Sequence, residues 1–186
     1  MAKVKFGFKN CYYATVTENE GVYTYGTPVR LAGAVSMSLD PSGDTTEFYA
    51  DDSKYFSDEN NNGYEGSLEL AMIPDSFKRD ILGENEDANG VMFEKSTVVN
   101  KPFALLCEFT TDTKARKYVF YNCMAKRPTV GATTKGENVD VQTESLDLVI
   151  RPNLDGVVKA STKDDTDTTT LEGWYTQVYT ETELSA

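Results

Sequence analysis

Two segments of the chain alternate between apolar and polar or small side chains, and this two-residue period is that of a β-strand with one buried face. In residues 31–39, one face carries Leu31, Gly33, Val35, Met37 and Leu39, and the other carries Ala32, Ala34, Ser36 and Ser38. In residues 64–72, one face carries Tyr64, Gly66, Leu68, Leu70 and Met72, and the other carries Glu65, Ser67, Glu69 and Ala71. Each segment predicts a half-buried strand.

Strand patterns rich in β-branched and aromatic residues recur along the rest of the chain. They predict strands over residues 4–16, 91–99, 103–109, 117–124, 138–151 and 157–160. The third and fourth of these flank the polar turn at residues 110–116 and are expected to pair. In the fifth, the apolar positions change from odd (Val141) to even (Leu146), which requires a bulge or break near residues 142–145.

Helical signals occur in two places. Residues 74–83 offer Asp75 or Ser76 as an N-cap and Gly83 as a left-handed end, which predicts a helix of about two turns. Residues 169–179 carry apolar and aromatic side chains at helical spacing, and Thr169 with Glu172 matches a capping box. We expect this C-terminal helix to dock on the edge of the sheet.

These elements predict a mainly β protein with one short flanking helix and a short C-terminal helix. A length of 186 residues is typical of one domain whose core is large enough to be stable without disulfide bonds or a structural metal. We therefore expect a single domain over residues 1–186. The three cysteines form no C-x-x-C pair and are expected to be inert core residues. No apolar run has the length of a signal peptide or membrane span, so we expect a soluble protein made in a cytoplasm.

Charge and composition exclude several functions. The formal net charge is −12 at pH 7, so an exposed phosphate backbone would be repelled rather than bound. Histidine is absent, which removes the commonest general base and the commonest metal ligand. The nucleotide-binding and hydrolase motifs are also missing. We therefore expect neither an enzyme nor a cofactor.

Half of the net charge lies in residues 40–62. The acids of this segment are Asp40, Asp44, Glu47, Asp51, Asp52, Asp58 and Glu59, against Lys54 alone. A connection of this length is usually functional or disordered, and the aromatic residues within it can pack. We predict a long acidic loop that contacts a partner; a merely solvated loop is the alternative.

Residues 58–69 match the spacing of an EF-hand calcium loop, with Gly63 at the turn position. An EF-hand loop lies between two helices, whereas residues 64–72 alternate as a strand and residues 51–57 lack helical periodicity. We interpret the segment as an Asn- and Gly-rich turn into a strand, and expect no metal site. A stand-alone β-sandwich binding module, with calcium held by residues 58–69, remains the alternative function.

Several longer segments resemble the major tail proteins of long-tailed, non-contractile phages and prophages of Gram-positive bacteria. The first group is residues 9–17 (KNCYYATVT), 26–36 (GTPVRLAGAVS), 39–52 (LDPSGDTTEFYADD) and 62–66 (NGYEG). The second is residues 73–83 (IPDSFKRDILG), 101–107 (KPFALLC), 116–123 (RKYVFYNC) and 142–146 (QTESL). Their order is that of the family, and the resemblance spans about residues 6–179.

The resemblance implies a β-sandwich of the tail-tube type. It also implies rings, hexameric in this family, that stack into the tail tube and conduct DNA into the host. Its implied partners are further copies of the chain, the tape-measure protein, and tail-terminator or tail-tip proteins. DNA would pass without specific binding and no membrane would be involved; the protein would belong to the virion tail after synthesis in the bacterial host cytoplasm.

Two sets of residues become candidate assembly sites under this resemblance. Glu65, Ser67 and Glu69 would point into the lumen, with Ala32, Ala34, Ser36 and Ser38 as small neighbours, because an anionic wall repels DNA phosphates. The long acidic loop would contact the adjacent ring. Its candidate residues are Asp40, Asp44, Glu47, Asp51, Asp52 and Asp58.

Overall fold

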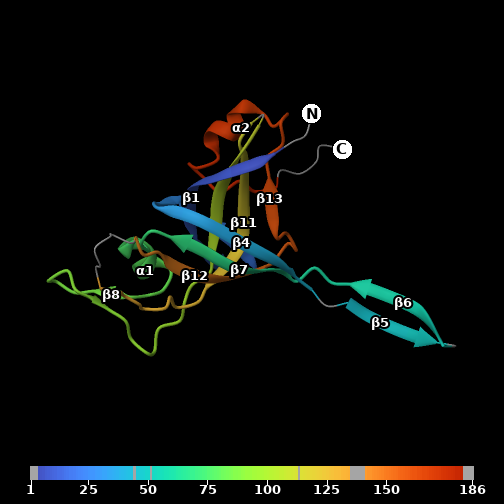
Figure 1. The fold of residues 1–186 in the computed structure, drawn as a ribbon, viewed down its shortest axis with the longest axis horizontal. Coiled ribbons are helices and arrows are strands. Elements are labelled where there is room, and N and C mark those ends of the chain that lie inside the picture. Colours follow the sequence, from blue (N-terminus) through green and yellow to red (C-terminus); the bar gives the residue numbers. More distant parts are fainter. Residues whose placement is uncertain (1–3, 44, 51, 113, 135–140, 182–186) are drawn as a thin grey trace.

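The computed structural model describes residues 4–43, 45–50, 52–112, 114–134 and 141–181, and one antiparallel sheet dominates it (Figure 1). The sheet contains β1 (Lys5–Asn19), β2 (Val22–Tyr25), β3 (Val29–Leu31), β4 (Ala34–Ser42), β7 (Gly63–Leu70), β10 (Phe103–Thr111), β11 (Arg116–Ala125), β12 (Glu144–Arg151) and β13 (Lys159–Ser161). Two separate hairpins are β5 (Thr45–Ala50) with β6 (Ser53–Glu59), and β8 (Asn85–Glu86) with β9 (Met92–Phe93). The helices are α1 (Asp75–Asp80) and α2 (Thr168–Gly173). The prediction of a mainly β fold with two short helices is confirmed.

The strand pairs follow one another around the sheet until it bends over on itself. From β1 the order runs through β10, β11, β12 and β7 to β4. A tight turn at Ala32 and Gly33 joins β4 to β3, and β3 pairs with β1. Gly33 has a φ of +83°, a conformation that favours glycine. The bent sheet encloses its core in the manner of the predicted β-sandwich.

The larger core lies inside this bend and is closed at one end by α1. Phe77 of α1 is fully buried, and its ring meets those of Tyr13 and Phe103 edge-on, with centroids 5.1 and 5.2 Å apart. Cys11, Cys107 and Cys123 are buried free thiols of the same core, as predicted. Burial raises the pKa of Cys11 to about 12, so this thiol is protonated at neutral pH.

A second core lies on the opposite side of β1, β10 and β11, beneath the C-terminal segment. Trp174 and Val178 are buried there against apolar residues of these three strands. The Lys117 ammonium donates to the Leu171 carbonyl (2.6 Å), and the Tyr121 hydroxyl donates to the Tyr179 carbonyl (2.7 Å). The segment therefore covers the face of central strands, and the prediction that it docks on the edge of the sheet was wrong. Within the described residues, no helix is long and apolar enough to cross a membrane.

Both helices are shorter than predicted and use different caps. α1 begins after Pro74, which makes no side-chain capping bond, and Gly83 adopts the expected positive φ of +74° beyond its end. α2 begins one residue early because the Asp167 carboxylate accepts from the Thr170 amide (3.2 Å). It ends at Gly173 instead of continuing to residue 179, and the chain there turns through a bond from the Thr176 amide to the Gly173 carbonyl.

The strand predictions are confirmed where a strand lines a core. β10 and β11 pair as expected, and β7 occupies most of residues 64–72. The segment at residues 31–39 is two strands, because the turn at Gly33 interrupts it. The predicted strand at residues 91–99 shrinks to β9, and that at residues 138–151 begins at Glu144, in the region where the parity change required a break.

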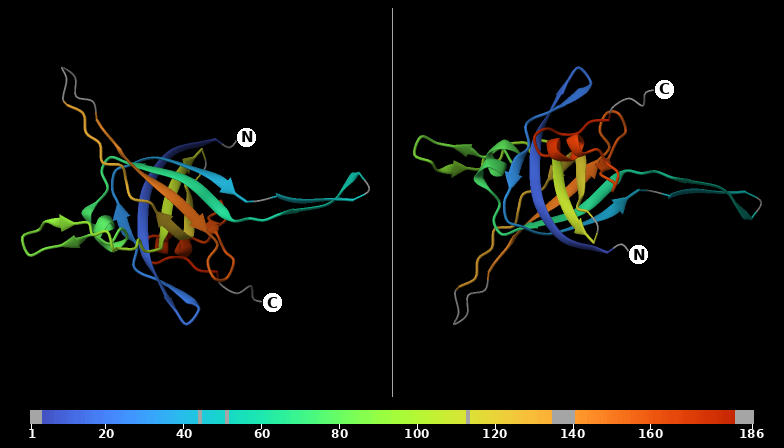
Figure 2. Two further views of the ribbon diagram at one scale, coloured as in Figure 1. Left: turned by 90° about the horizontal axis from the view of Figure 1, so that it is seen from below. Right: turned by 90° about the horizontal axis from the view of Figure 1, so that it is seen from above.

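The predicted long loop at residues 40–62 is mostly strand. β4 continues to Ser42, and β5 and β6 form a hairpin that projects far from the bent sheet before β7 begins (Figures 1 and 2). Two residues of the predicted loop, Asp44 and Asp51, lie outside the described residues. The segment is therefore an acidic arm, which we call the β5–β6 hairpin.

Candidate functional site

Three neighbouring strands, β12, β7 and β4, present one open polar face. Their other face carries the apolar residues that fill the larger core. The register places Asp40 opposite Glu65, Ser38 opposite Ser67, and Ser36 opposite Glu69. On the other side of β7, Val149, Asp147 and Ser145 lie opposite the same three residues. We call these nine side chains the anionic face: Ser36, Ser38, Asp40, Glu65, Ser67, Glu69, Ser145, Asp147 and Val149.

The predicted residues Glu65, Ser67 and Glu69 thus lie together, with Ser36 and Ser38 beside them. Ala32 and Ala34 do not join them, and that part of the prediction was wrong. Ala32 lies in the turn before β4, and Ala34 packs against the core. A bulge between Ala34 and Ser36 shifts the register, so the alternation that holds from Ser36 onward does not extend back to Ala34.

Glu69 is held in place by two hydroxyl groups, one from β4 and one from the residue just before β12. The Ser36 hydroxyl donates to one carboxylate oxygen (2.7 Å) and the Thr143 hydroxyl to the other (2.5 Å). The hydrogen bond from Thr143, followed by that from Ser36, lowers the pKa of Glu69. Glu69 therefore stays charged and oriented on the surface at neutral pH.

Asp40 and Glu65 form a cross-strand pair of like charges on the anionic face. Both side chains are exposed. Like charges directly opposite each other destabilise a sheet, and nothing in the folding of one chain requires them here. A sheet position that opposes folding is a candidate for a role outside the isolated chain.

The other predicted acids are divided between two places. Asp40, expected in the long loop, belongs instead to β4 and the anionic face. Glu47 lies in β5, Asp58 in β6, and Asp52 in the turn between these strands. Asp52 therefore lies at the far turn of the β5–β6 hairpin, whereas Glu47 and Asp58 lie in the half nearer the sheet.

The EF-hand pattern falls on residues that form strands. Residues 58–69 run from the end of β6 through a short connection into β7, where an EF-hand needs helices on both sides. Gly63, its turn residue, is the first residue of β7, and Glu69, its last ligand position, already binds two hydroxyl groups. The pattern is a turn into a strand, as the alternation indicated.

Sequence reasoning did not assign Ser145 and Asp147 to this face. The signal was present, because Leu146, Leu148 and Ile150 alternate with them and point into the core. What was missing was the pairing of β12 with β7, which joins segments about 80 residues apart in sequence.

A family model described as phage tail tube protein matches residues 2–177 of the chain. The chain belongs to the phage tail tube protein family. A comparison with curated proteins found no significant match. The tail tube protein is therefore a structural component of the phage tail and the virion, in a family that is not one of enzymes. In that setting, the open polar face and the projecting hairpin are candidate assembly surfaces.

Proposed function

We propose that the tail tube protein polymerises into stacked hexameric rings and that the anionic face lines the lumen of the resulting tube. The observation that carries this proposal is the like-charge pair of Asp40 and Glu65 on an open sheet face. With Glu69 and Asp147, this face carries four carboxylates, and Arg151 borders them in a hollow that it lines with Glu65 and Val149, so the face is net negative. Such a surface suits a wall past which another polyanion must move.

The physical reason lies in the charge of DNA. A basic lumen would release counterions and hold the phosphate backbone, whereas an anionic lumen repels it and prevents adhesion. DNA would therefore pass into the host without specific binding. The tape-measure protein would occupy the lumen during assembly, and tail-terminator and tail-tip proteins would bind the ends of the tube.

The β5–β6 hairpin is our candidate for the contact between rings. It projects well beyond the sheet, and a hairpin of two strands is only marginally stable by itself in water. A contact with an adjacent ring would bury it. This role replaces the one predicted for a loop at residues 40–62.

Electron microscopy of the purified, concentrated protein tests polymerisation, with light scattering on the same sample to give the mass. We expect rings or hollow tubes of uniform diameter. A variant in which residues 45–59 are replaced by a two-residue turn should remain folded, because no core residue is lost, but should not form tubes. Buried Trp174 provides the folding control through its fluorescence. Normal tubes from the shortened variant would contradict the role of the hairpin.

A map of the tube tests the lumen assignment separately. Glu65, Glu69 and Asp147 should face the channel. If these carboxylates face the outside of the tube, the anionic face is not the lumen wall, even if the protein polymerises.

A further inference from the structure

A pocket of about 580 Å³ opens on the side of the tail tube protein that carries the second core. It lies where β2, β11, the turn after β12 and the end of the described C-terminal segment come together. This volume is within the range of pockets that hold small molecules. We call it the tyrosine pocket, because three tyrosines and two acids carry its chemistry: Tyr23, Tyr25, Tyr121, Asp155 and Glu181.

The tyrosine rings give the pocket walls that meet at an angle. The ring centroids of Tyr25 and Tyr121 are 5.9 Å apart, and their planes are inclined by 56°. The Tyr121 ring is fixed, because it is buried and its hydroxyl donates to the Tyr179 carbonyl (2.7 Å). Tyr23 lies two residues before Tyr25 in β2, so the two side chains share one face of the strand. Aromatic walls at an angle form the kind of cage in which proteins bind ammonium groups.

The two carboxylates lie beside these rings. Burial raises the pKa of Tyr25 and of Tyr121, and the charges of Asp155 and Glu181, respectively, add to the rise. Each carboxylate is therefore close to one ring of the cage, and both are exposed to solvent. Among the described residues that line the pocket, none is basic, and no basic side chain of the described part of the chain pairs with either carboxylate. The pocket is thus both aromatic and anionic.

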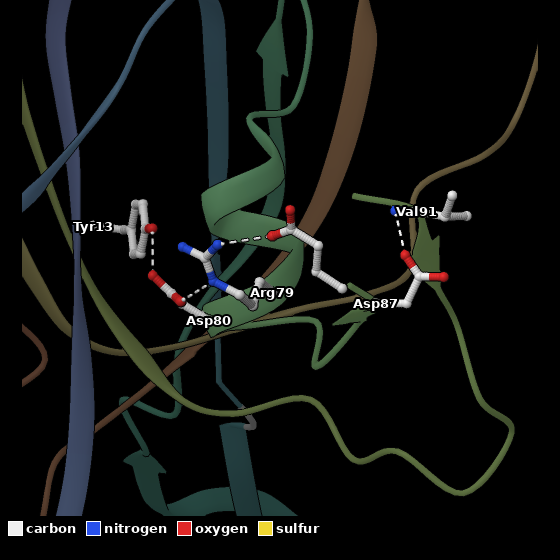
Figure 3. A network of polar contacts seen from close by, with 6 residues as sticks. Tyr13, Arg79, Asp80, Asp87 and Val91 are labelled. Atoms are coloured by element: carbon white, nitrogen blue, oxygen red, sulfur yellow. Dashed lines mark hydrogen bonds and ion pairs between the residues drawn. The ribbon is translucent and has the colours of Figure 1, made fainter. Parts of the chain in front are cut away.

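The Tyr25 hydroxyl is buried and forms no hydrogen bond within the described part of the chain. By contrast, the hydroxyl of buried Tyr13 donates to Asp80 at 2.9 Å (Figure 3). Asn153 lies near Tyr25, but its side-chain oxygen already accepts two backbone amides of its own turn, at 3.1 and 2.8 Å. Buried hydroxyls are nearly always hydrogen-bonded, so this one marks a position at which a ligand can add a bond. Its oxygen is covered, and a ligand reaches it when the exposed turn at residues 154–156 moves aside.

We propose that the tyrosine pocket binds a linear aliphatic amine with two ammonium groups. One ammonium group lies beside Asp155 and donates to the Tyr25 oxygen, and the other lies beside Glu181. The alkyl chain packs against Val22 and Val157, which also line the pocket. An anion would be repelled by the carboxylates, and a neutral sugar would gain nothing from their charge. The pocket shares no residue with the anionic face or the β5–β6 hairpin, so this inference and the proposed function can fail independently.

Calorimetric titration of the purified protein tests the inference. The titrants are linear diamines from putrescine to diaminooctane, and diols of the same chain lengths are the uncharged controls. We expect at least one diamine to bind saturably, with one molecule per chain, and the diol of that length to give no saturable heat. A diol that binds as tightly as its diamine, or no saturable binding of any diamine, would overturn the inference.

Removal of the carboxylates tests the location of the site. Asp155→Asn and Glu181→Gln should each weaken binding of the best diamine by at least about fivefold. The control changes Asp165→Asn and Glu172→Gln remove the same charge at exposed positions that do not line the pocket. Each should change the affinity by less than about twofold. Equal weakening by both pairs would mean that amines only gather around a negative protein, and would refute the site.

Tyr25→Phe tests the pocket without a change of charge. The variant keeps the aromatic ring and loses a buried hydroxyl that has no partner, so the free chain should be no less stable. It should nevertheless bind the diamine about threefold more weakly, because one hydrogen bond to the ammonium group is lost. Tyr55→Phe, at an exposed position outside the pocket, should bind as the wild type does, and Trp174 fluorescence reports folding of both variants. Wild-type affinity in Tyr25→Phe would contradict the proposed pose of the amine.

Discussion

The like-charge pair of Asp40 and Glu65 makes a quantitative prediction about the isolated tail tube protein. Asp40→Asn or Glu65→Gln should stabilise the folded chain, because each change removes a cross-strand repulsion and neither carboxylate accepts a side-chain hydrogen bond from the described residues that the change would remove. The matched control is Glu18→Gln. Glu18 is also an exposed strand residue, but it lies opposite uncharged Tyr23. All three changes alter the net charge by the same amount.

The size of the effect follows from the register. Side chains directly opposite each other have Cβ atoms about 5 Å apart, which places the two carboxylates at about 6 Å. Their repulsion in a water-like dielectric is then about 0.7 kcal/mol. Screening reduces it to about 0.6 kcal/mol at 0.01 M salt and about 0.3 kcal/mol at 0.15 M. The repulsion should therefore be resolved best at low salt.

Urea unfolding of the wild type, both single variants and the double variant gives the pair energy as a double-mutant cycle. Urea is required because guanidinium chloride would screen the charges. We expect a coupling energy of about 0.6 kcal/mol at 0.01 M salt, which falls by about half at 0.15 M, while Glu18→Gln changes stability less at both. A coupling energy of zero at low salt, or one that does not change with salt, would refute the reasoning.

Other predictions concern the two cores and their titrating groups. Phe77→Ala should lower the free energy of unfolding by about 3–5 kcal/mol in urea titrations, whereas exposed Met72→Ala should change it by less than about 0.5 kcal/mol. Tyr175→Phe removes a hydroxyl that donates to buried Glu108 (3.0 Å) and should cost about 1–3 kcal/mol, with a red shift of Trp174 fluorescence that Tyr55→Phe does not produce. Burial raises the pKa of Cys11 from 9.0 to about 12, so its contribution to stability is complete below pH 9 and is lost as the pH rises towards 12. Cys11→Ala should make the loss of stability over that pH range shallower, and an identical pH profile would contradict this.

The sequence predicted those strands that line a core. In β7 and β12, the alternation of Leu68 with Glu69, or of Leu146 with Asp147, directly reflects burial on one side. β10 was predicted from a continuous apolar run, because both of its faces are buried. The cysteines were assigned to the core because two of them lie in apolar runs and none forms a C-x-x-C pair, and all three are buried. Periodicity is informative wherever the two sides of an element have different surroundings.

The β5–β6 hairpin was missed because it lies away from the sheet and its core. A strand pair of this kind has no required apolar face, so charged and aromatic residues in positions 45–59 gave no two-residue period. The prediction for residues 91–99 failed in the opposite way, because a strand was expected where only β9 forms. Val91, Phe93 and Val99 suggested a strand, but these side chains are exposed on the β8–β9 hairpin and the segment that follows it.

The composition of the anionic face depended on pairing between distant segments. The sequence placed Glu65 and Glu69 on one face of β7, but it could not show that Asp40 lies opposite Glu65 or that Asp147 lies across from Ser67. The bulge after Ala34 likewise depends on tertiary structure, because the parity of residues 31–39 alone continues without a break.

The features that sequence reasoning explained least are also those that do least for the isolated chain. Opposed carboxylates at Asp40 and Glu65, exposed Val99 and Val130, and a hairpin far from the core each oppose or fail to support folding of one copy. Their costs are individually small against the stability that the two cores provide, so one chain can carry them. Assembly would change the hairpin and the carboxylates, because the hairpin would be buried between copies while the carboxylates would face a channel for DNA. The departures from local rules are thus concentrated on the surfaces through which a tail tube subunit would meet its neighbours and its cargo.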